Sequence, residues 1–172
     1  MMKLYHGTNV EFRQLNPEMS RDGLDFGKGA YLTPDMDQAW GMAKRKQMVM
    51  GGRRIVMEFD FDDSCLSDNS AGCLCFDSYN EKWTGFVLRN RNKAWHYVHE
   101  YPVVYGPVAD GIMPTVIDDY LSKYPDEVTA LKPENLSLLT NKLMFKKHNS
   151  RQACFCSTEA IVKYLKFIRL YE

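Results

Sequence analysis

The sequence lacks an excess of charge of either sign. Its 22 lysines and arginines balance 22 aspartates and glutamates, so the formal net charge is zero. A field over the whole molecule that gathers phosphate backbones or anionic lipid is therefore absent, and nothing in the charge balance signals nucleic acid. Hydrophobic residues make up 45% and aromatic residues 13% of the chain. This composition is typical of a globular protein and not of a disordered or fibrous one.

A long apolar run is also missing. The first residues contain one lysine before His6, and no stretch has the length that a signal peptide or a membrane span needs. We therefore expect a cytoplasmic protein without a membrane partner. No internal repeat, low-complexity tract or linker rich in proline and serine divides the chain, so residues 1–172 are predicted to form a single domain.

Cysteines are few and odd in number, which argues against a disulfide framework. They lie in apolar stretches such as "CLCF" and "ACFC", where reduced thiols pack well. The five are Cys65, Cys73, Cys75, Cys154 and Cys156. The second and third, followed by His96 and His99, offer four zinc ligands, but a spacer of two to four residues between cysteines would be usual. We predict packing and no metal.

Hydrophobic periodicity in the first half of the chain predicts a strand at 3–8, a surface loop at 9–25 and a helix after Pro34. The basic run at 44–46 is expected to form the last turn of that helix, where cations complement the helix dipole, and Gly51-Gly52 to end it. Residues 54–62 alternate as a half-buried strand should.

The second half of the chain is predicted to hold a helix at 79–91 and a strand at 101–111 that Gly106-Pro107 breaks. Two helices follow around 114–123 and 133–145, then a strand at 151–156. In a last helix, Ile161, Tyr164, Leu165 and Ile168 are expected to form one face, with Ser157 or Thr158 as the cap. Strands come both singly and between helices, so the predicted class is α+β.

The buried stripe of the 79–91 helix ends on an amide, Asn90. A buried amide needs hydrogen-bond partners. Two interpretations stay open: a bond at the helix end to a neighbouring loop, or a polar site that Asn90 faces with Arg91 beside it.

Two short motifs carry the most information about function. The first is "YHGT" at 5–8 and the second is "FGKGAYLT" at 26–33. Glycine lets the backbone approach a ligand closely or take a positive φ in a tight turn. The second motif precedes a strand, whereas the dinucleotide fingerprint G-x-G-x-x-G follows a strand and opens a helix. A Rossmann site is therefore not predicted.

Together, His6-Gly7-Thr8 and the segment from Phe26 to Tyr31 resemble the ADP-ribosyltransferase superfamily, in its poly(ADP-ribose) polymerase and diphtheria-toxin-like branch. In that branch, a first strand ends in His-Gly-Thr/Ser, and Phe-Gly-x-Gly-x-Tyr follows about two dozen residues later. The whole chain looks most like a little-characterised bacterial family of this branch, also through "WTGFVLRNR", "VVYGPVAD" and "RQACF". The resemblance implies a split antiparallel β-sheet core with flanking helices.

The resemblance also implies roles for single residues toward NAD as co-substrate. His6 would hydrogen-bond the adenosine-side ribose, and Gly7 would offer its backbone to the nicotinamide amide. Tyr31 would lay its ring against nicotinamide, and Trp40 or another ring on the following helix would close the sandwich. The remaining predicted NAD-binding residues are Thr8, Phe26, Gly27, Gly29, Asn90 and Arg91.

The third position of the pattern departs from the better-known enzymes. They carry a catalytic glutamate on a late strand, where this chain has Gln152 in "RQACFC". The resemblance thus implies His6, Tyr31 and Gln152 as the catalytic residues. A neutral amide still binds a ribose hydroxyl, but more weakly than a charged acceptor. Asp25 or Asp110 could supply the missing charge, although turn chemistry explains both as well. Glu159 is interpreted as charge at the start of a helix.

We therefore predict a mono-ADP-ribosyltransferase that cleaves the nicotinamide–ribose bond of NAD and transfers ADP-ribose to a protein or nucleic acid that the sequence does not identify. Such an enzyme would suit a bacterial toxin or defence effector, with an antitoxin protein as a partner. The first alternative is an NAD- or ADP-ribose-binding module with weak or no activity. The second is a plain α+β interaction domain.

Overall fold

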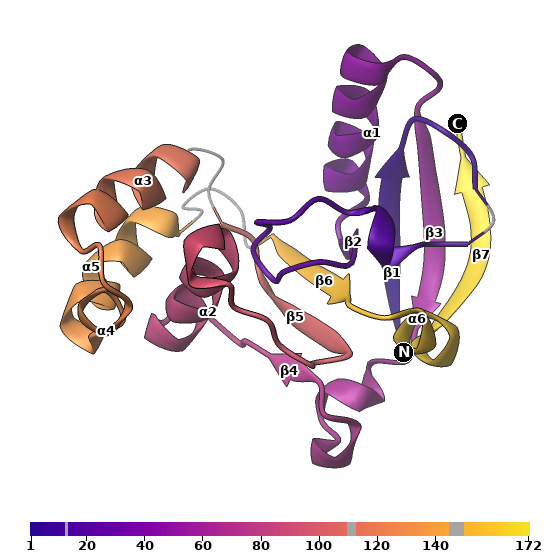
Figure 1. Cartoon of the computed structure of the whole chain (residues 1–172). Helices are drawn as coiled ribbons and strands as arrows, with labels where there is room; N and C mark the ends of the chain where they lie inside the picture. Colours follow the sequence, from indigo (N-terminus) through magenta and orange to yellow (C-terminus); the bar gives the residue numbers. More distant parts are fainter. Residues whose placement is uncertain (13, 110–112, 145–149) are drawn as a thin grey trace.

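The computed structural model describes residues 1–12, 14–109, 113–144 and 150–172. These residues form two mostly antiparallel β-sheets and six α-helices, which confirms the predicted α+β class. The four-stranded sheet lies in the middle of the molecule, between the three-stranded sheet with one long helix against it and a group of helices on the other side (Figure 1). Among the described residues, no helix is both long and apolar enough to cross a bilayer.

The first sheet, sheet A, has the strand order β1-β3-β7, and both outer strands pair antiparallel with β3. Its strands are β1 (Met2–Thr8), β3 (Ile55–Phe61) and β7 (Leu165–Tyr171). Glu58 in the middle of β3 is buried and accepts bonds from Lys3, Arg169 and Tyr171 on the two flanking strands. These donors, led by Tyr171, lower the pKa of Glu58 to about 2, so the carboxylate stays charged and ties the three strands together.

The second sheet, sheet B, has the strand order β2-β6-β5-β4, in which only the β4–β5 pair is parallel among the described strands. Its strands are β2 (Ala30–Leu32), β4 (Leu74–Cys75), β5 (Val103–Pro107) and β6 (Arg151–Phe155). An isolated bridge between Tyr5 and Thr33 connects the two sheets through backbone bonds of 2.7 and 2.9 Å. Beyond this bridge, no pairing between β1 and β2 is found among the described strands, so the two sheets part there.

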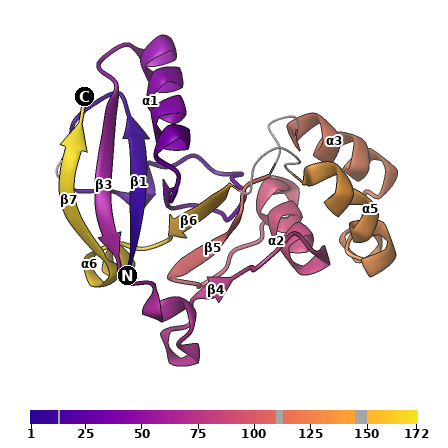
Figure 2. The ribbon, with the colours of Figure 1, turned by 180° about the vertical axis from the view of Figure 1, so that it is seen from behind.

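The six described α-helices are α1 (Met36–Met50), α2 (Glu81–Arg91), α3 (Met113–Lys123), α4 (Glu127–Ala130), α5 (Pro133–Leu143) and α6 (Thr158–Tyr164). Of these, α1 covers the outer face of sheet A, α6 packs into the layer between the sheets, and the other four lie beyond sheet B. Short 3₁₀ turns are η1 (Pro17–Met19), η2 (Asp63–Leu66), η3 (Asn69–Ala71) and η4 (Lys93–Trp95). Seen from behind, α1 still lies along β1 and β3, while α3 and α5 remain on the far side of α2 (Figure 2).

Three apolar layers alternate with these elements. Ala39 and Ala43 of α1 pack on Val56 at the outer face of sheet A. A second layer lies between the sheets, where Phe61 and Phe155 meet edge to face at 5.2 Å. The third layer joins the outer face of sheet B to helices α2 and α5, with Trp83, Val87 and Leu139 nearly or fully buried in it. Each such side chain contributes about 1.5 to 3 kcal/mol through burial.

Several sequence-based predictions are confirmed. Strand β1, helix α1 with its end at Gly51, helix α2 and strand β6 lie where periodicity placed them. Ser157 caps α6 by accepting a bond from the Ala160 N–H, and Glu159 lies in the first turn. The five cysteines are free thiols.

Other predictions are wrong in instructive ways. The last helix ends at Tyr164, and Leu165 and Ile168 belong to strand β7 instead. Strand β3 is buried on both faces and not half-buried, because α1 covers the face opposite the central layer. Strand β5 continues through Gly106-Pro107, which pair with β6. The basic run at 44–46 precedes the last turn of α1, which reaches Met50. The short helix α4 was not foreseen.

Candidate functional site

The gap between β1 and β2 is bridged by the ring of His6. Its Nδ1 lies 2.8 Å from the Tyr31 carbonyl oxygen. Because a carbonyl only accepts, Nδ1 carries the proton and Nε2 has the lone pair. Burial is the main cause, and the Lys46 ammonium the second, of a His6 pKa lowered to about 4, so the ring is neutral at pH 7.

Lys46, on α1, reaches back over the edge of β1. Its Nζ donates to the Gly7 carbonyl oxygen at 2.9 Å and lies 3.5 Å from His6 Nε2. The side chain is partly buried, and burial lowers the pKa of its ammonium group. In the part of the chain that the structure describes, no carboxylate lies within ion-pair distance of Nζ. This residue was not among the predicted site residues.

Gly7 is pressed against the backbone of α1. A Cβ at this position would lie 2.0 Å from the Ala39 carbonyl oxygen and 2.9 Å from the Ala43 nitrogen, so only glycine fits. Its carbonyl points to the open edge of β1, where Lys46 binds it. The next residue, Thr8, is buried, and its hydroxyl forms a turn with the backbone of Val10. The structure thus gives Gly7 and Thr8 packing and turn roles in addition to those that the resemblance implies.

Tyr31 closes the loop that precedes β2. Its hydroxyl donates to the Gly27 carbonyl at 2.7 Å and accepts from the Phe26 N–H at 3.0 Å. Burial raises the pKa of this phenol well above its usual range, which keeps the hydroxyl protonated as a donor. Gly27 has a φ of 82°, a left-handed conformation that glycine adopts without strain. Phe26 is fully buried in the layer between sheet B and α2.

The ring of His6 lies on the face of β1 that points to the layer between the sheets, whereas the ring of Tyr31 lies on the face of β2 that points away from this layer. Leu4 and Leu32 belong to the layer between the sheets, whereas Tyr31 packs in the layer beyond sheet B. Since side chains alternate along a strand, His6 shares the face of Leu4 and Tyr31 the face opposite Leu32. The structure brings the two residues together through the Tyr31 carbonyl and not ring to ring.

Gln152, Asp25 and Arg91 form one hydrogen-bonded network. Arg91 donates to Asp25 Oδ1 through Nε at 2.9 Å and Nη2 at 2.5 Å, and Gln152 Nε2 donates to Asp25 Oδ2 at 2.8 Å. The Asp25 side chain is 7% exposed and that of Arg91 19%. Gln152 shares a strand face with Cys154, which pairs in register with Tyr31. The network therefore lies on the Tyr31 side of sheet B.

The other predicted site residues lie around this network or away from it. Asn90 donates to the Phe86 carbonyl of its own helix, and its Oδ1 faces Gly27. The Gly29 N–H is bound by the Ser20 hydroxyl. Trp40 packs on sheet A with Tyr5, and its ring does not pair with Tyr31 among the described aromatic contacts. Asp110 lies outside the described residues.

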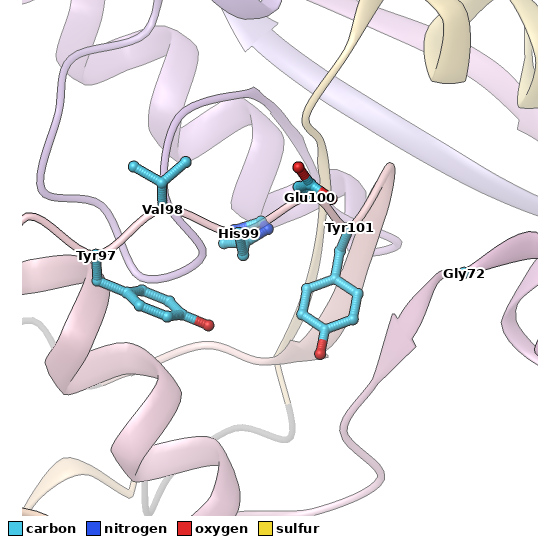
Figure 3. Close-up of a pocket in the computed structure, with 6 residues that line it drawn as sticks. All are labelled: Gly72, Tyr97, Val98, His99, Glu100 and Tyr101. Carbon is cyan, nitrogen blue, oxygen red and sulfur yellow. The ribbon is translucent and has the colours of Figure 1, made fainter.

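A separate hollow of ≈ 590 Å³ opens beside the segment that leads into β5 (Figure 3). It is lined by Gly72, Tyr97, Val98, His99, Glu100 and Tyr101. His99 Nε2 donates to the Phe26 carbonyl at 2.8 Å, so this hollow shares a wall with the loop that Tyr31 closes. None of the predicted catalytic or NAD-binding residues lines it. The alternation of rings in "YVHEY" is the signal that could have identified this wall from the sequence.

A family model described as "Protein of unknown function (DUF3990)" matches residues 2–167. No curated protein and no solved structure matches the chain.

Proposed function

The chain belongs to the DUF3990 family, and we propose that it is a mono-ADP-ribosyltransferase with an ADP-ribosyltransferase-like split core and NAD as co-substrate. Three features support this proposal. The two sheets are mostly antiparallel and part beyond the bridge between Tyr5 and Thr33. His6 contacts the backbone of Tyr31 across that gap. Gln152, the residue at the third position, lies on a strand that pairs with β2.

The contact between Gln152 and Asp25 carries the proposal. A carboxylate only accepts, so the amide must turn its NH₂ group to Asp25. Its carbonyl oxygen is thereby fixed as the end that can accept a bond from a ribose hydroxyl. Asp25 in turn is held by Arg91. The glutamate of the better-known enzymes is thus replaced by an amide whose orientation a buried carboxylate sets.

The reaction that this arrangement would serve is substitution at the ribose carbon bound to nicotinamide. The carbon–nitrogen bond breaks, and its electron pair leaves with nicotinamide. The ribose becomes oxocarbenium-like, and a nucleophile of the acceptor then bonds to the carbon and loses its proton. Compared with a charged acceptor, a neutral amide gives about 1 to 2 kcal/mol less stabilisation, which corresponds to a rate about five- to thirtyfold lower. Related families with a non-acidic residue at the third position transfer a single ADP-ribose, so the resemblance favours transfer of one ADP-ribose over chain building.

Incubation with labelled NAD tests the proposal. We expect release of nicotinamide and label on an acceptor from a bacterial lysate. Gln152→Ala should reduce the rate at least tenfold, because the oriented amide oxygen is lost. Glu159→Gln is the matched control, since Glu159 is exposed in the first turn of α6 and should not affect turnover. Activity that follows Glu159 and not Gln152 would contradict the assignment.

An NAD-binding module without turnover is the second candidate. The specific observation in its favour is that Arg91 already neutralises Asp25, so the third position presents no free negative charge. Saturable binding of NAD with no nicotinamide release would support it. NAD at a concentration of about one hundred times its dissociation constant should stabilise the fold by about 2.7 kcal/mol. No thermal shift with NAD would favour an interaction domain instead.

A further inference from the structure

Lys46 presents a partly buried positive charge that the described protein does not neutralise. Its Nζ has one carbonyl oxygen, that of Gly7, at 2.9 Å and one imidazole nitrogen, that of His6, at 3.5 Å. None of the carboxylates that form ion pairs in the described ranges pairs with it. Withdrawing an ammonium from water is costly unless an anion or several hydrogen bonds compensate. The partner that is missing from this arrangement is an anion.

The surroundings of Lys46 suit a ligand and not a structural ion pair. The unpaired edge of β1 beyond the Tyr5–Thr33 bridge and the neutral ring of His6 meet at its ammonium group. Lys44, two residues earlier on α1, is exposed and enters no ion pair among the described residues. A lysine on this helix can therefore remain in solvent, and the partial burial of Lys46 is specific to its position. The four-carbon side chain of lysine can swing by several ångströms while the helix stays in place.

We propose that Lys46 binds a phosphate group of a nucleotide ligand at the open end of β1. The inference rests on the proposed function for the identity of the ligand, the pyrophosphate of NAD or ADP-ribose, and not for the anionic chemistry of the site. In the structure, the ammonium group donates a hydrogen bond to the Gly7 carbonyl. The resemblance assigns this same carbonyl to the nicotinamide amide. When the ligand binds, its nicotinamide amide would then replace Lys46 as the donor to the Gly7 carbonyl, and the Lys46 ammonium group would move to the phosphate.

This exchange predicts effects of opposite sign for ligands with and without phosphate. Nicotinamide alone must displace Lys46 without giving it an anion, so removal of the ammonium group should leave its affinity unchanged or increase it. ADP-ribose and inorganic pyrophosphate bring the anion but no nicotinamide amide. The same change should therefore lower their affinity about tenfold or more, as loss of a charge-assisted hydrogen bond does. Their affinity should also fall with salt.

Calorimetric titration of four proteins tests the site: the wild type, Lys46→Met, Lys46→Arg and, as the matched control, Lys44→Met. The probes are NAD, ADP-ribose, inorganic pyrophosphate and nicotinamide. We expect Lys46→Met to lose affinity for the first three, Lys46→Arg to keep most of it, and Lys44→Met to match the wild type. Thermal unfolding of each variant shows that the fold is retained, and Lys46→Arg provides the comparison if Lys46→Met does not fold.

The outcomes separate this inference from the transferase proposal. Equal affinity of the wild type and Lys46→Met for ADP-ribose and pyrophosphate overturns the phosphate site, even if nicotinamide is released at a normal rate. An equal loss in Lys44→Met also overturns it, because the effect would then be one of general charge. Binding that depends on Lys46 without any release of nicotinamide keeps the site and contradicts the transferase. A wild type that binds none of the phosphate probes overturns the site.

Discussion

Asp25 and Lys46 are two charged groups of the candidate site, and their surroundings differ sharply. Asp25 receives three hydrogen bonds, two from Arg91 and one from Gln152, and is almost fully buried. Lys46 makes contact with one carbonyl and one neutral ring. The first arrangement is complete without a ligand and serves to position Gln152. The second is incomplete, which indicates where a ligand would supply what the protein does not.

The largest loss of folding stability is expected when the Asp25 network is broken. Asp25→Ala leaves the Arg91 guanidinium partly buried without its carboxylate and releases Gln152. Removing one member of a buried ion pair costs about 3 to 5 kcal/mol. Urea unfolding should show this loss. A double variant, Asp25→Ala with Arg91→Met, should recover part of it, and a cost below about 1 kcal/mol for the single variant would show that the network is not structural.

A smaller loss of folding stability is expected when Gly7, whose carbonyl binds Lys46, is replaced by alanine. Gly7→Ala places a methyl group 2.0 Å from the Ala39 carbonyl, so α1 must move away from β1. Overpacking of this kind costs about 1 to 3 kcal/mol. Gly41→Ala on the same helix is the control: nothing lies within 4 Å of its added Cβ, and alanine should stabilise the helix by about 0.5 to 1 kcal/mol. Similar denaturation midpoints for the two variants would contradict the close packing.

The smallest effect is the part of the His6 pKa shift that Lys46 causes, because burial is the main cause of that shift. The folded His6 has a pKa of about 4 against an ordinary value of 6.5, so the unfolded chain binds the extra proton between these values. His6 therefore contributes a loss of stability as pH falls from 6.5 to 4. Lys46→Met should raise the pKa of folded His6, because the ammonium no longer opposes its protonation, and should reduce that loss.

Proton NMR titration of the His6 ring measures the pKa, and urea unfolding across the same pH range measures the loss of stability. His6→Gln is the reference, since the difference between it and the wild type isolates this residue from the carboxylates that titrate nearby in pH. A His6 ring that titrates near 6.5 in the wild type would show that neither burial nor Lys46 acts on it.

The sequence was sufficient where a local signal decided the structure. Ser157 or Thr158 before an amphipathic run predicted the start of α6, and Gly51-Gly52 predicted the end of α1. It was insufficient where a distant strand decided. Leu165 and Ile168 continue a helical pattern, but pairing with β3 draws them into β7. Likewise, Gly106-Pro107 reads as a break, whereas its position opposite β6 keeps it in the sheet.

The same distinction applies to the candidate site. The motifs identified His6, Tyr31 and Gln152 as residues worth following, and Asp25 as a source of charge. The contact of Asp25 with Gln152 spans 127 positions of the chain, so no local pattern could predict it. Lys46 belonged to a basic run that suggested only helix-end charge. Its direction toward Gly7 depends on how α1 lies on sheet A, which is a property of packing.

The contact between α1 and β1 also determines which substitutions this chain tolerates. Ala39 and Ala43 are fully buried where the helix meets the strand. A larger side chain at either position would lift the helix and carry Lys46 away from Gly7. In a library of random variants, selection for folded protein should therefore retain only glycine, alanine or serine at 39 and 43. Met48 and Val49, exposed on the same helix, should vary almost freely.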